Sequence, residues 1–308
     1  MKNVAVLVGR SSEREISLKT AAGIIAALQS RGYHTYQMEI DAQLPSALQA
    51  RPVDVAFIAS HGKFGEDGTV QGLLEIMGIP YVGSGVLASA LAMNKIISKK
   101  IFELEHIRTP KWLSVDKYTD LEKSSEYVNE VFIGIEHLIV KPASQGSSIG
   151  LTLVKERRDL LPALQLALKY DDEVLIEEAI SGTELTVAIW GNHELTVLPC
   201  IEIVSSNEVY DYEAKYVLNR SIHVIPPRIA PAVEEEAKAM ALQAHRALGC
   251  RGISRSDFFA DKKGRCWLLE VNTLPGMTGT SLVPDAAKAF GYSYEDLVEK
   301  LIQLALEA

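Results

Sequence analysis

The sequence predicts an α/β protein with a parallel sheet at its N-terminus, followed by two regions that mix helices and strands. The first observation is the alternation of apolar runs with amphipathic stretches over residues 1–93, which is typical of a parallel sheet covered by helices. The second is that residues 94–180 and 181–308 each contain β-rich runs paired around polar turns. The chain is therefore expected to form three domains with these boundaries.

In the first region, the five apolar residues 4–8 predict a buried strand. An amphipathic helix is expected to follow and to end near Gly32. The remaining expected elements are strands at 35–40 and 54–60 and a helix at 68–78. The loops at 9–15 and 60–68 would leave the carboxyl ends of strands, where parallel sheets bind their ligands.

The second region should contain one helix over residues 89–104, followed by two β-rich runs around a Gly/Ser loop within 137–154. A helix at 158–170 and a strand at 173–180 complete it. In the third region, a strand pair over 184–204 should turn at Gly191 and Asn192. A polar, Tyr-rich loop at 205–221, a helix at 232–249 and a hairpin at 253–272 are expected to follow.

The composition is that of an ordinary globular protein. Of its 308 residues, 47% are hydrophobic and 23% are charged, and the formal net charge is −9. That balance argues against binding to nucleic acids or anionic membranes. No apolar run approaches the ~20 residues needed to span a bilayer, and the N-terminal run is too short for a signal peptide. The three widely spaced cysteines fit neither a disulfide framework nor a zinc motif. We therefore expect a cytoplasmic protein.

The hairpin at 253–272 carries charges that a buried hairpin does not need. If the loop Asp-Lys-Lys-Gly closes it, Arg255 lies opposite Glu270, with Asp257 diagonal to Glu270. Because strand side chains alternate, Arg255, Asp257, Glu270 and Asn272 would share one face. Diagonal neighbours are roughly 7–8 Å apart, a gap that a divalent cation can bridge between carboxylates. A solvated polar face is the alternative.

Other candidate groups are individually ambiguous. Lys141 ends a strand before the Gly/Ser turn of "KPASQGSSIG", whose N–H groups could hold a phosphate, although the segment lacks the GK[ST] of a Walker A motif and a flexible loop would explain it equally well. The turn within "NTLPGMTGTSLVP" could bind an oxyanion or simply cap a helix. Taken singly, Glu13 is most economically a helix-terminal acid and His61 a loop histidine. Lys95 and Lys215 would be surface lysines, and Glu177 and Glu184 would be solvated carboxylates.

The order of these segments resembles the ATP-grasp superfamily and, within it, the D-alanine–D-alanine ligases. The resemblance runs through essentially the whole chain, including "SSEREISL", "IVKPASQGSSIG", "VLIEEAISGTELTVAI", "YDYEAKY" and "RSDFF". Two segments are highly specific: "HGKFGEDGTVQGLLE" and "NTLPGMTGTSLVP". The resemblance implies a three-domain ATP-grasp fold with a Rossmann-like N-terminal sheet and ATP held between the second and third domains.

By this resemblance, one group of residues binds the nucleotide and its metal. Lys95 and Lys141 would contact ATP phosphates, and Lys215 would meet the transferred phosphate. Glu177 would sit at the adenine, and Glu184 would hold the ribose hydroxyls. Two magnesium ions, for which manganese can substitute, would be held by Asp257, Glu270 and Asn272.

A second group would bind the two D-alanines. Glu13 would bind the ammonium of the first and would be linked to Ser147 and Tyr216 by hydrogen bonds, with His61 beside the same substrate. Arg255 and the Gly276 N–H would stabilise the developing oxyanion. Ser281 and Leu282 would bind the carboxylate and border the side chain of the second D-alanine.

The implied reaction joins two D-alanines through an acyl phosphate for peptidoglycan precursor synthesis, in an enzyme expected to be a homodimer. Rival hypotheses are a ligase that uses D-lactate, which Tyr216 argues against by resemblance, another ATP-grasp ligase, a kinase, and a catalytically silent ATP-binding protein. One departure stands out: the family usually has two glycines after its first strand, but Arg10 follows Gly9 here. A bulky cation at this position is expected to influence the loop that carries Glu13.

Overall fold

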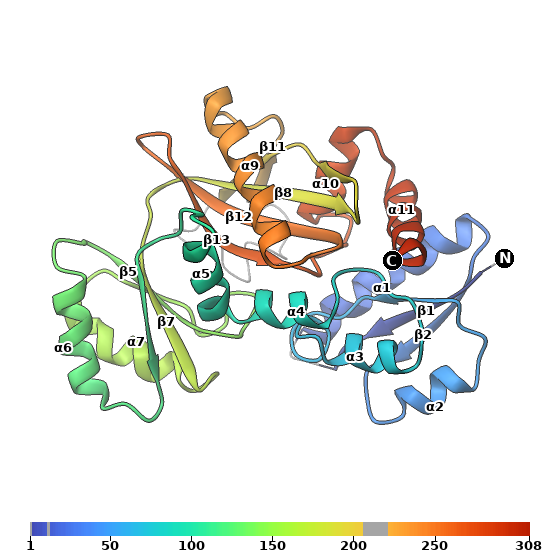
Figure 1. Ribbon diagram of the computed structural model, residues 1–308, viewed down its shortest axis with the longest axis horizontal. Coiled ribbons are helices and arrows are strands. Elements are labelled where there is room, and N and C mark those ends of the chain that lie inside the picture. The colour runs from blue at the N-terminus through green and yellow to red at the C-terminus, as the bar shows by residue number, and fades with distance from the viewer. Residues whose placement is uncertain (1, 11–12, 206–220) are drawn as a thin grey trace.

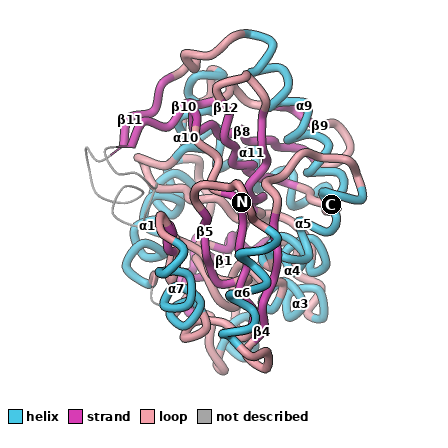
Figure 2. The backbone as a smooth tube through the Cα atoms, turned by 90° about the vertical axis from the view of Figure 1, so that its left-hand side faces the viewer, coloured by secondary structure: helices cyan, strands magenta, loops and turns pink. Residues whose placement is uncertain are grey.

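Three β-sheets organise the described part of the protein. The structure, a computed structural model, describes residues 2–10, 13–205 and 221–308. Figure 1 shows one sheet near the chain termini, a second at the opposite end beside α6 and α7, and a third between them under α9. Seen from the side, β8, β10 and β12 of the third sheet lie at the top, and α6 and β4 of the second lie toward the bottom (Figure 2).

The first sheet is parallel, as predicted, with strand order β2-β1-β3. Side chains of β1 alternate between two cores, since Val4, Val6 and Val8 pack into one and Ala5 and Leu7 into the other. Its elements are β1 (Asn3–Val8), α1 (Arg14–Ser30), β2 (His34–Glu39), α2 (Leu44–Gln49), β3 (Val55–Ile58) and α3 (Thr69–Ile76). Because β1 and β3 are parallel, the loops that follow them leave the same end of the sheet.

The single helix predicted over 89–104 is wrong, because the chain breaks there into α4 (Val86–Met93) and α5 (Lys95–Leu104). Asn94 is extended, with φ −86° and ψ 102°, and its side-chain oxygen accepts a 3.0 Å bond from the Ile97 N–H. An Asn at such a position is a strong helix N-cap. The break orients α5 so that its first residue, Lys95, donates its backbone N–H to Ala143 O at 2.9 Å.

The second sheet has four antiparallel strands in the order β4-β7-β5-β6. The two predicted β-rich runs around the Gly/Ser loop are β5 and β6, which pair directly. Apolar residues of α6 and α7 cover one face of this sheet. Its elements are β4 (Trp112–Asp116), α6 (Leu121–Val131), β5 (Leu138–Pro142), β6 (Thr152–Val154), α7 (Leu160–Ala167) and β7 (Glu173–Glu178), with a short 3-10 turn at Arg157–Asp159.

The third sheet carries the predicted hairpin at its edge, in the order β11-β10-β8-β12-β13, with β9 also paired to β8. The turn expected at Gly191 and Asn192 follows β8, but the chain after it divides into two strands rather than one. The elements are β8 (Gly182–Gly191), β9 (Leu195–Val197), β10 (Ile201–Ser205), β11 (Ser221–Val224), α9 (Pro231–Ala247), β12 (Gly252–Asp261) and β13 (Cys266–Asn272).

The last two helices, α10 (Leu282–Phe290) and α11 (Tyr294–Glu307), return to the first sheet. Apolar residues of α11, α1, β1 and the third sheet form one continuous core, and Figure 1 shows α11 beside α1. This shared core joins the first and third sheets on one side of the molecule. The domain boundaries predicted after residues 93 and 180 stay predictions; they fall at the end of α4 and between β7 and β8.

Candidate active site

The charged hairpin is present, but its register differs from the prediction by two residues. Arg255 faces Asn272, and Asp257 faces Glu270, instead of Arg255 facing Glu270. Two shifts of one residue add up: the turn is longer than predicted, so Ala260 faces Cys266 instead of Arg265, and a β-bulge next to Asp257 and Phe258 shifts the pairing once more. Because side chains alternate, a shift of two leaves all four polar groups on one face. The prediction of a shared polar face is therefore correct, although the predicted pairing is wrong.

Asp257 is held by two neighbours. Arg255 donates to both of its oxygens, from Nε at 2.8 Å and from NH2 at 2.7 Å. Thr186, on the adjacent strand β8, donates its hydroxyl to Asp257 Oδ1 at 2.6 Å. A bidentate pair of this kind fixes geometry as well as charge. Asp257 is thus oriented by one residue on its own strand and by one on the adjacent strand β8.

Glu270 and Asn272 lie next to this pair on β13. Glu270 Oε2 lies 3.6 Å from Lys95 Nζ, which also donates a 2.7 Å bond to Gln145 O. Asn272 Oδ1 accepts the Leu274 N–H at 2.9 Å, which fixes the turn that follows the strand. Lys95 brings α5 and the Gly/Ser loop to the hairpin's polar face, so three distant segments of the chain meet there.

A cavity of about 520 Å³ opens between the second and third sheets. Lys141, Glu177 and Glu184 line it together with Asp257 and Glu270. Apolar residues such as Ile139, Ile180, Phe259 and Leu269 complete the wall, which is the mixture expected of a nucleotide-sized pocket.

Glu177 is not the solvated carboxylate that its sequence context suggested, since only 3% of it is exposed. Its Oε1 lies 2.5 Å from Lys141 Nζ, and its Oε2 lies 2.8 Å from Lys99 Nζ. Burial opposes the charge of Glu177, but the two ammonium groups outweigh it and lower the pKa of this carboxyl. Burial likewise opposes the charge of Lys141, yet Glu177 and Glu270 raise the pKa of its ammonium.

Lys99 was missed by sequence reasoning. It follows Lys95 by one helical turn, and its side chain is completely buried. The available signal was the spacing of four, which places both lysines on the same face of α5.

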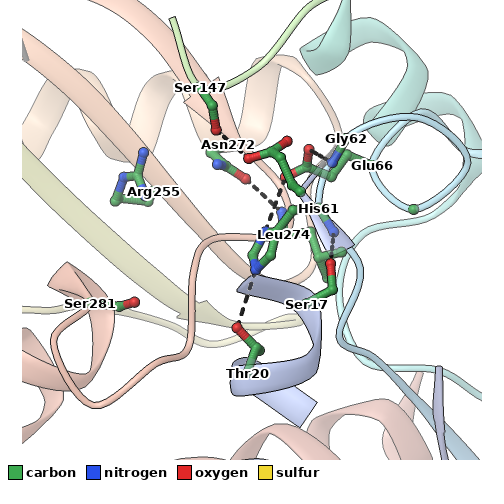
Figure 3. Close-up of polar contacts among 12 residues, drawn as sticks. Ser17, Thr20, His61, Gly62, Glu66, Ser147, Arg255, Asn272, Leu274 and Ser281 are labelled. Carbon is green, nitrogen blue, oxygen red and sulfur yellow. Dashed lines mark hydrogen bonds and ion pairs between the residues drawn. The ribbon is translucent and has the colours of Figure 1, made fainter. Parts of the chain in front are cut away.

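A smaller cavity of about 100 Å³ lies between the first and third sheets. Glu13, which is 4% exposed, lines it and accepts a short hydrogen bond from the Ser147 hydroxyl. Ser147 has φ 50°, a left-handed conformation that is uncommon for a residue with a side chain. Figure 3 shows Ser147, Arg255 and Ser281 arranged around this space.

His61 lines the smaller cavity. Its backbone N–H donates to Ser17 Oγ at 3.1 Å, and its Nε2 lies 3.3 Å from Thr20 Oγ1 (Figure 3). Its Nδ1 lies 4.0 Å from Glu66, whose other oxygen accepts the Gly62 N–H at 2.6 Å. Glu66 was not selected from the sequence. These contacts hold the ring in a fixed orientation beside Glu13.

The turn after β13 supplies the last predicted residues. Gly276, Ser281 and Leu282 all line the smaller cavity. Ser281 is the N-cap residue of α10, and its hydroxyl accepts the Thr278 N–H at 3.0 Å. A Cβ added to Gly276 would lie 3.0 Å from Ser281 Oγ, so the turn packs closely only because residue 276 is glycine.

The two cavities share a wall made of Lys95, Gly146, Ser147 and Glu270. Fourteen of the sixteen predicted site residues line one cavity or the other. The remaining two, Lys215 and Tyr216, lie outside the described residues.

Arg10 points away from the site. Its Nε lies 2.8 Å from Glu39 Oε2, and its NH1 lies 3.2 Å from Asp41 Oδ2, at the carboxyl end of β2. The side chain is 58% exposed, so the residue that departs from the family pattern contacts solvent and these acids.

Within residues 2–10, 13–205 and 221–308, no cluster of three or more His, Cys, Asp or Glu side chains is placed to hold a metal. The predicted magnesium ligands are two carboxylates and one amide, Asp257, Glu270 and Asn272. In the same described ranges, no helix is both long and apolar enough to cross a membrane.

Comparison with known proteins gives a consistent result. Family models described as the D-ala D-ala ligase N-terminus and C-terminus match residues 37–84 and 101–303. D-alanine–D-alanine ligase of Pelotomaculum thermopropionicum is 48% identical over 99% of this chain and 96% of its own. The ligase of Carboxydothermus hydrogenoformans is 48% identical over 100% of this chain and 99% of its own.

Solved structures agree. D-alanine–D-alanine ligase from Bacillus anthracis, complexed with ATP, superposes with a TM-score of 0.86 at 33% identity, covering 100% of this chain and 98% of that one. VanG D-Ala:D-Ser ligase from Enterococcus faecalis gives 0.86 at 32% identity, with 99% of both chains covered. The fold and the joined cavities thus define an ATP-grasp ligase. Within that class, the chain belongs to the D-alanine–D-alanine ligase family.

Proposed function

We propose that this enzyme joins two D-alanines to D-alanyl-D-alanine at the expense of ATP, through a D-alanyl phosphate, for peptidoglycan precursor synthesis. The observation that carries the proposal is the wall shared by the two cavities. A nucleotide in the larger cavity and an amino acid in the smaller one would meet across Lys95, Ser147 and Glu270.

ATP occupies the larger cavity in this proposal. Lys95 and Lys141 approach the phosphates as point charges, and Glu184 holds the ribose hydroxyls. Glu177 and residues 178–180 line this cavity, and in this proposal they lie at the adenine. Lys215, outside the described residues, is proposed to meet the transferred phosphate.

The first D-alanine occupies the smaller cavity. Its ammonium pairs with Glu13, which is oriented by Ser147, while His61 lies beside it. Its carboxylate oxygen attacks the γ-phosphorus and ADP leaves. This step crowds negative charge at the shared wall, where Lys95 and Arg255 reduce the repulsion. Tyr216, also outside the described residues, is proposed to complete the Glu13–Ser147 link.

The second D-alanine binds at Ser281 and Leu282, its carboxylate facing the α10 N-terminus. Its neutral amine attacks the acyl carbon, the new C–N bond forms, and the C–O bond to phosphate breaks. Inorganic phosphate leaves with the former carboxylate oxygen and takes up the proton that the amine loses. Arg255 and the Gly276 N–H are proposed to stabilise the oxyanion of that step. Water must be excluded, because the acyl phosphate would otherwise hydrolyse.

Asp257, Glu270 and Asn272 are proposed to hold magnesium. Their oxygens are the hard ligands that this ion prefers, and Asp257 and Glu270 face each other on paired strands. Both oxygens of Asp257 accept hydrogen bonds from Arg255, so a metal bound at Asp257 would lie beside this guanidinium unless Arg255 moves away from one of them. When bound, magnesium neutralises phosphate charge and orients the transferring group.

D-Alanine is favoured as the acceptor because the relatives named D-alanine–D-alanine ligase reach 48% identity, whereas the D-Ala:D-Ser ligase VanG reaches 32%. The test is phosphate release with ATP and magnesium, screened over D-alanine, D-serine and D-lactate, with products identified by mass. D-Alanyl-D-alanine as the main product supports the proposal. Phosphorylated D-alanine without a dipeptide would instead indicate a kinase.

We also propose a homodimer located in the cytoplasm.

A further inference from the structure

Lys99 is a charged residue of the active-site region to which the reaction scheme gives no role. It is among the largest fully buried side chains, and no part of it is exposed. Unlike Lys95 on the same helix, it is absent from the residues that line either cavity. Burial of a lysine costs several kcal/mol unless its charge is paired, so its position calls for a physical reason.

Its contacts connect three elements. The Nζ atom lies 2.8 Å from Glu177 Oε2 on β7 and donates a 2.6 Å hydrogen bond to Thr109 Oγ1. Thr109 in turn donates to the Leu268 carbonyl on β13 at 2.8 Å. Lys99 therefore links α5 to β7 of the second sheet and to β13, the hairpin strand that carries Glu270.

The charges around Glu177 explain what this arrangement achieves. Lys141, which lines the larger cavity, lies 2.5 Å from the other oxygen of Glu177. Lys141 and Glu177 alone would form a neutral pair, which has little net attraction for a phosphate. Adding Lys99 leaves the three groups with a net charge of +1, and the only one of the two lysines that reaches the cavity is Lys141.

We propose that Lys99 is the counter-charge of Glu177 and that it leaves the charge of Lys141 available to the nucleotide phosphates. Lys99 is thus a positioning residue, because it acts through Glu177 and Lys141 without touching the substrate. The inference rests on the proposed function, since it assumes that ATP occupies the larger cavity.

The charge arithmetic suggests a double-mutant test. Lys99→Met removes the counter-charge, and Lys99→Gln does so while keeping an N–H donor near Glu177. Lys99→Met combined with Glu177→Gln removes one positive and one negative charge, so Lys141 again stands alone with a net charge of +1. Lys117→Met, at an exposed lysine paired with Asp172, is the matched control.

The measurement is calorimetric titration of each variant with ATP and with adenosine, in the absence of D-alanine. We expect both Lys99 variants to bind ATP about tenfold more weakly, roughly 1.4 kcal/mol, with adenosine binding changed less than twofold. The double variant should recover most of the ATP affinity. If Lys99→Met does not fold, Lys99→Gln alone and Lys99→Gln combined with Glu177→Gln carry the same comparison.

Three results would overturn the inference: unchanged ATP affinity in the Lys99 variants, an equal loss for adenosine, or a double variant no better than the single. Unchanged ATP affinity is also the result expected if Lys99 is uncharged. Burial lowers the pKa of its ammonium, and the nearby Glu177 carboxylate opposes this shift. If the unaltered enzyme binds no ATP, the proposed function itself fails, which is a different outcome.

Discussion

Arg255 and Asp257, two residues apart on β12, are joined by two hydrogen bonds of 2.8 and 2.7 Å. The pair is largely buried, with side-chain exposures of 11% and 12%. The resemblance gives these residues different roles, one at the oxyanion and one at magnesium. Their pairing connects the two roles, because any movement of Arg255 toward an oxyanion also removes hydrogen bonds from Asp257.

Arg255→Met should destabilise the enzyme by about 3 kcal/mol in the absence of nucleotide and metal, because Asp257 would keep a buried charge without its partner. Asp257→Asn added to this variant should recover much of the loss, since the remaining amide is neutral. Urea unfolding of the unaltered enzyme, both single variants and the double variant measures this coupling. Additive effects of the two substitutions would show that the pair does not contribute to stability.

Removing the Ser147 hydroxyl should raise the KM for D-alanine by roughly tenfold, since a hydrogen bond to a carboxylate contributes about 1.5–3 kcal/mol. Ser147→Ala and Ser147→Gly should behave alike in steady-state kinetics. The glycine variant also relieves the left-handed backbone at φ 50°. An effect seen only with glycine would therefore implicate loop conformation instead of the bond to Glu13. Ser114→Ala, at an exposed position on β4, is the control.

Arg10→Gly, which restores the two-glycine pattern of the family, should change the KM for D-alanine by less than twofold. Arg10 is directed toward Glu39 and Asp41 and is 58% exposed, so its ion pairs contribute little. A large change in KM, with the KM for ATP unaltered, would show that this residue does reach the first amino-acid site.

His245 should make stability depend on pH. Burial, with a smaller contribution from Arg246, lowers the pKa of this histidine from 6.5 to about 4. Between pH 6.5 and about 4, His245 is protonated in the unfolded chain but neutral in the folded one. Stability is therefore lost as pH falls below the unfolded pKa of 6.5. By pH 5 the loss from this group should be about 2 kcal/mol.

The check is urea unfolding at pH 8 and pH 5 for the enzyme and for His245→Gln. The decrease in unfolding free energy between the two pH values should be smaller in the variant by about 2 kcal/mol. Equal decreases would mean that His245 does not stay neutral in the fold. Because His245 contacts Ser254 in the core, at 2.7 Å, the comparison uses the pH difference and not the absolute stability.

Local patterns in the sequence predicted much of this fold. The apolar run in β1 and the alternation that follows it were sufficient for the parallel sheet. The hairpin pairing was wrong for two reasons: the turn is one residue longer than the expected four-residue loop, and a bulge depends on packing that a loop length does not reveal. Its polar face was nevertheless correct, because an error of two residues preserves the side of the sheet.

Long-range relationships could not be predicted from local patterns. Lys99 lies on an amphipathic helix, where a lysine normally faces solvent, and only the folded chain brings Glu177 and Thr109 to it. The packing of α11 against the first sheet joins opposite ends of the chain. The Asn94 break was readable in principle, since Asn is a common N-cap residue, but the apolar periodicity on both sides concealed it.

The most direct test follows oxygen atoms. D-Alanine labelled with ¹⁸O in both carboxylate oxygens is incubated with the enzyme, ATP and magnesium, and the released phosphate is analysed by mass spectrometry. Activation as an acyl phosphate predicts one ¹⁸O in the phosphate for each dipeptide formed. Phosphate without label, released while dipeptide accumulates, would contradict the account, because the carboxylate would never have been bonded to phosphorus.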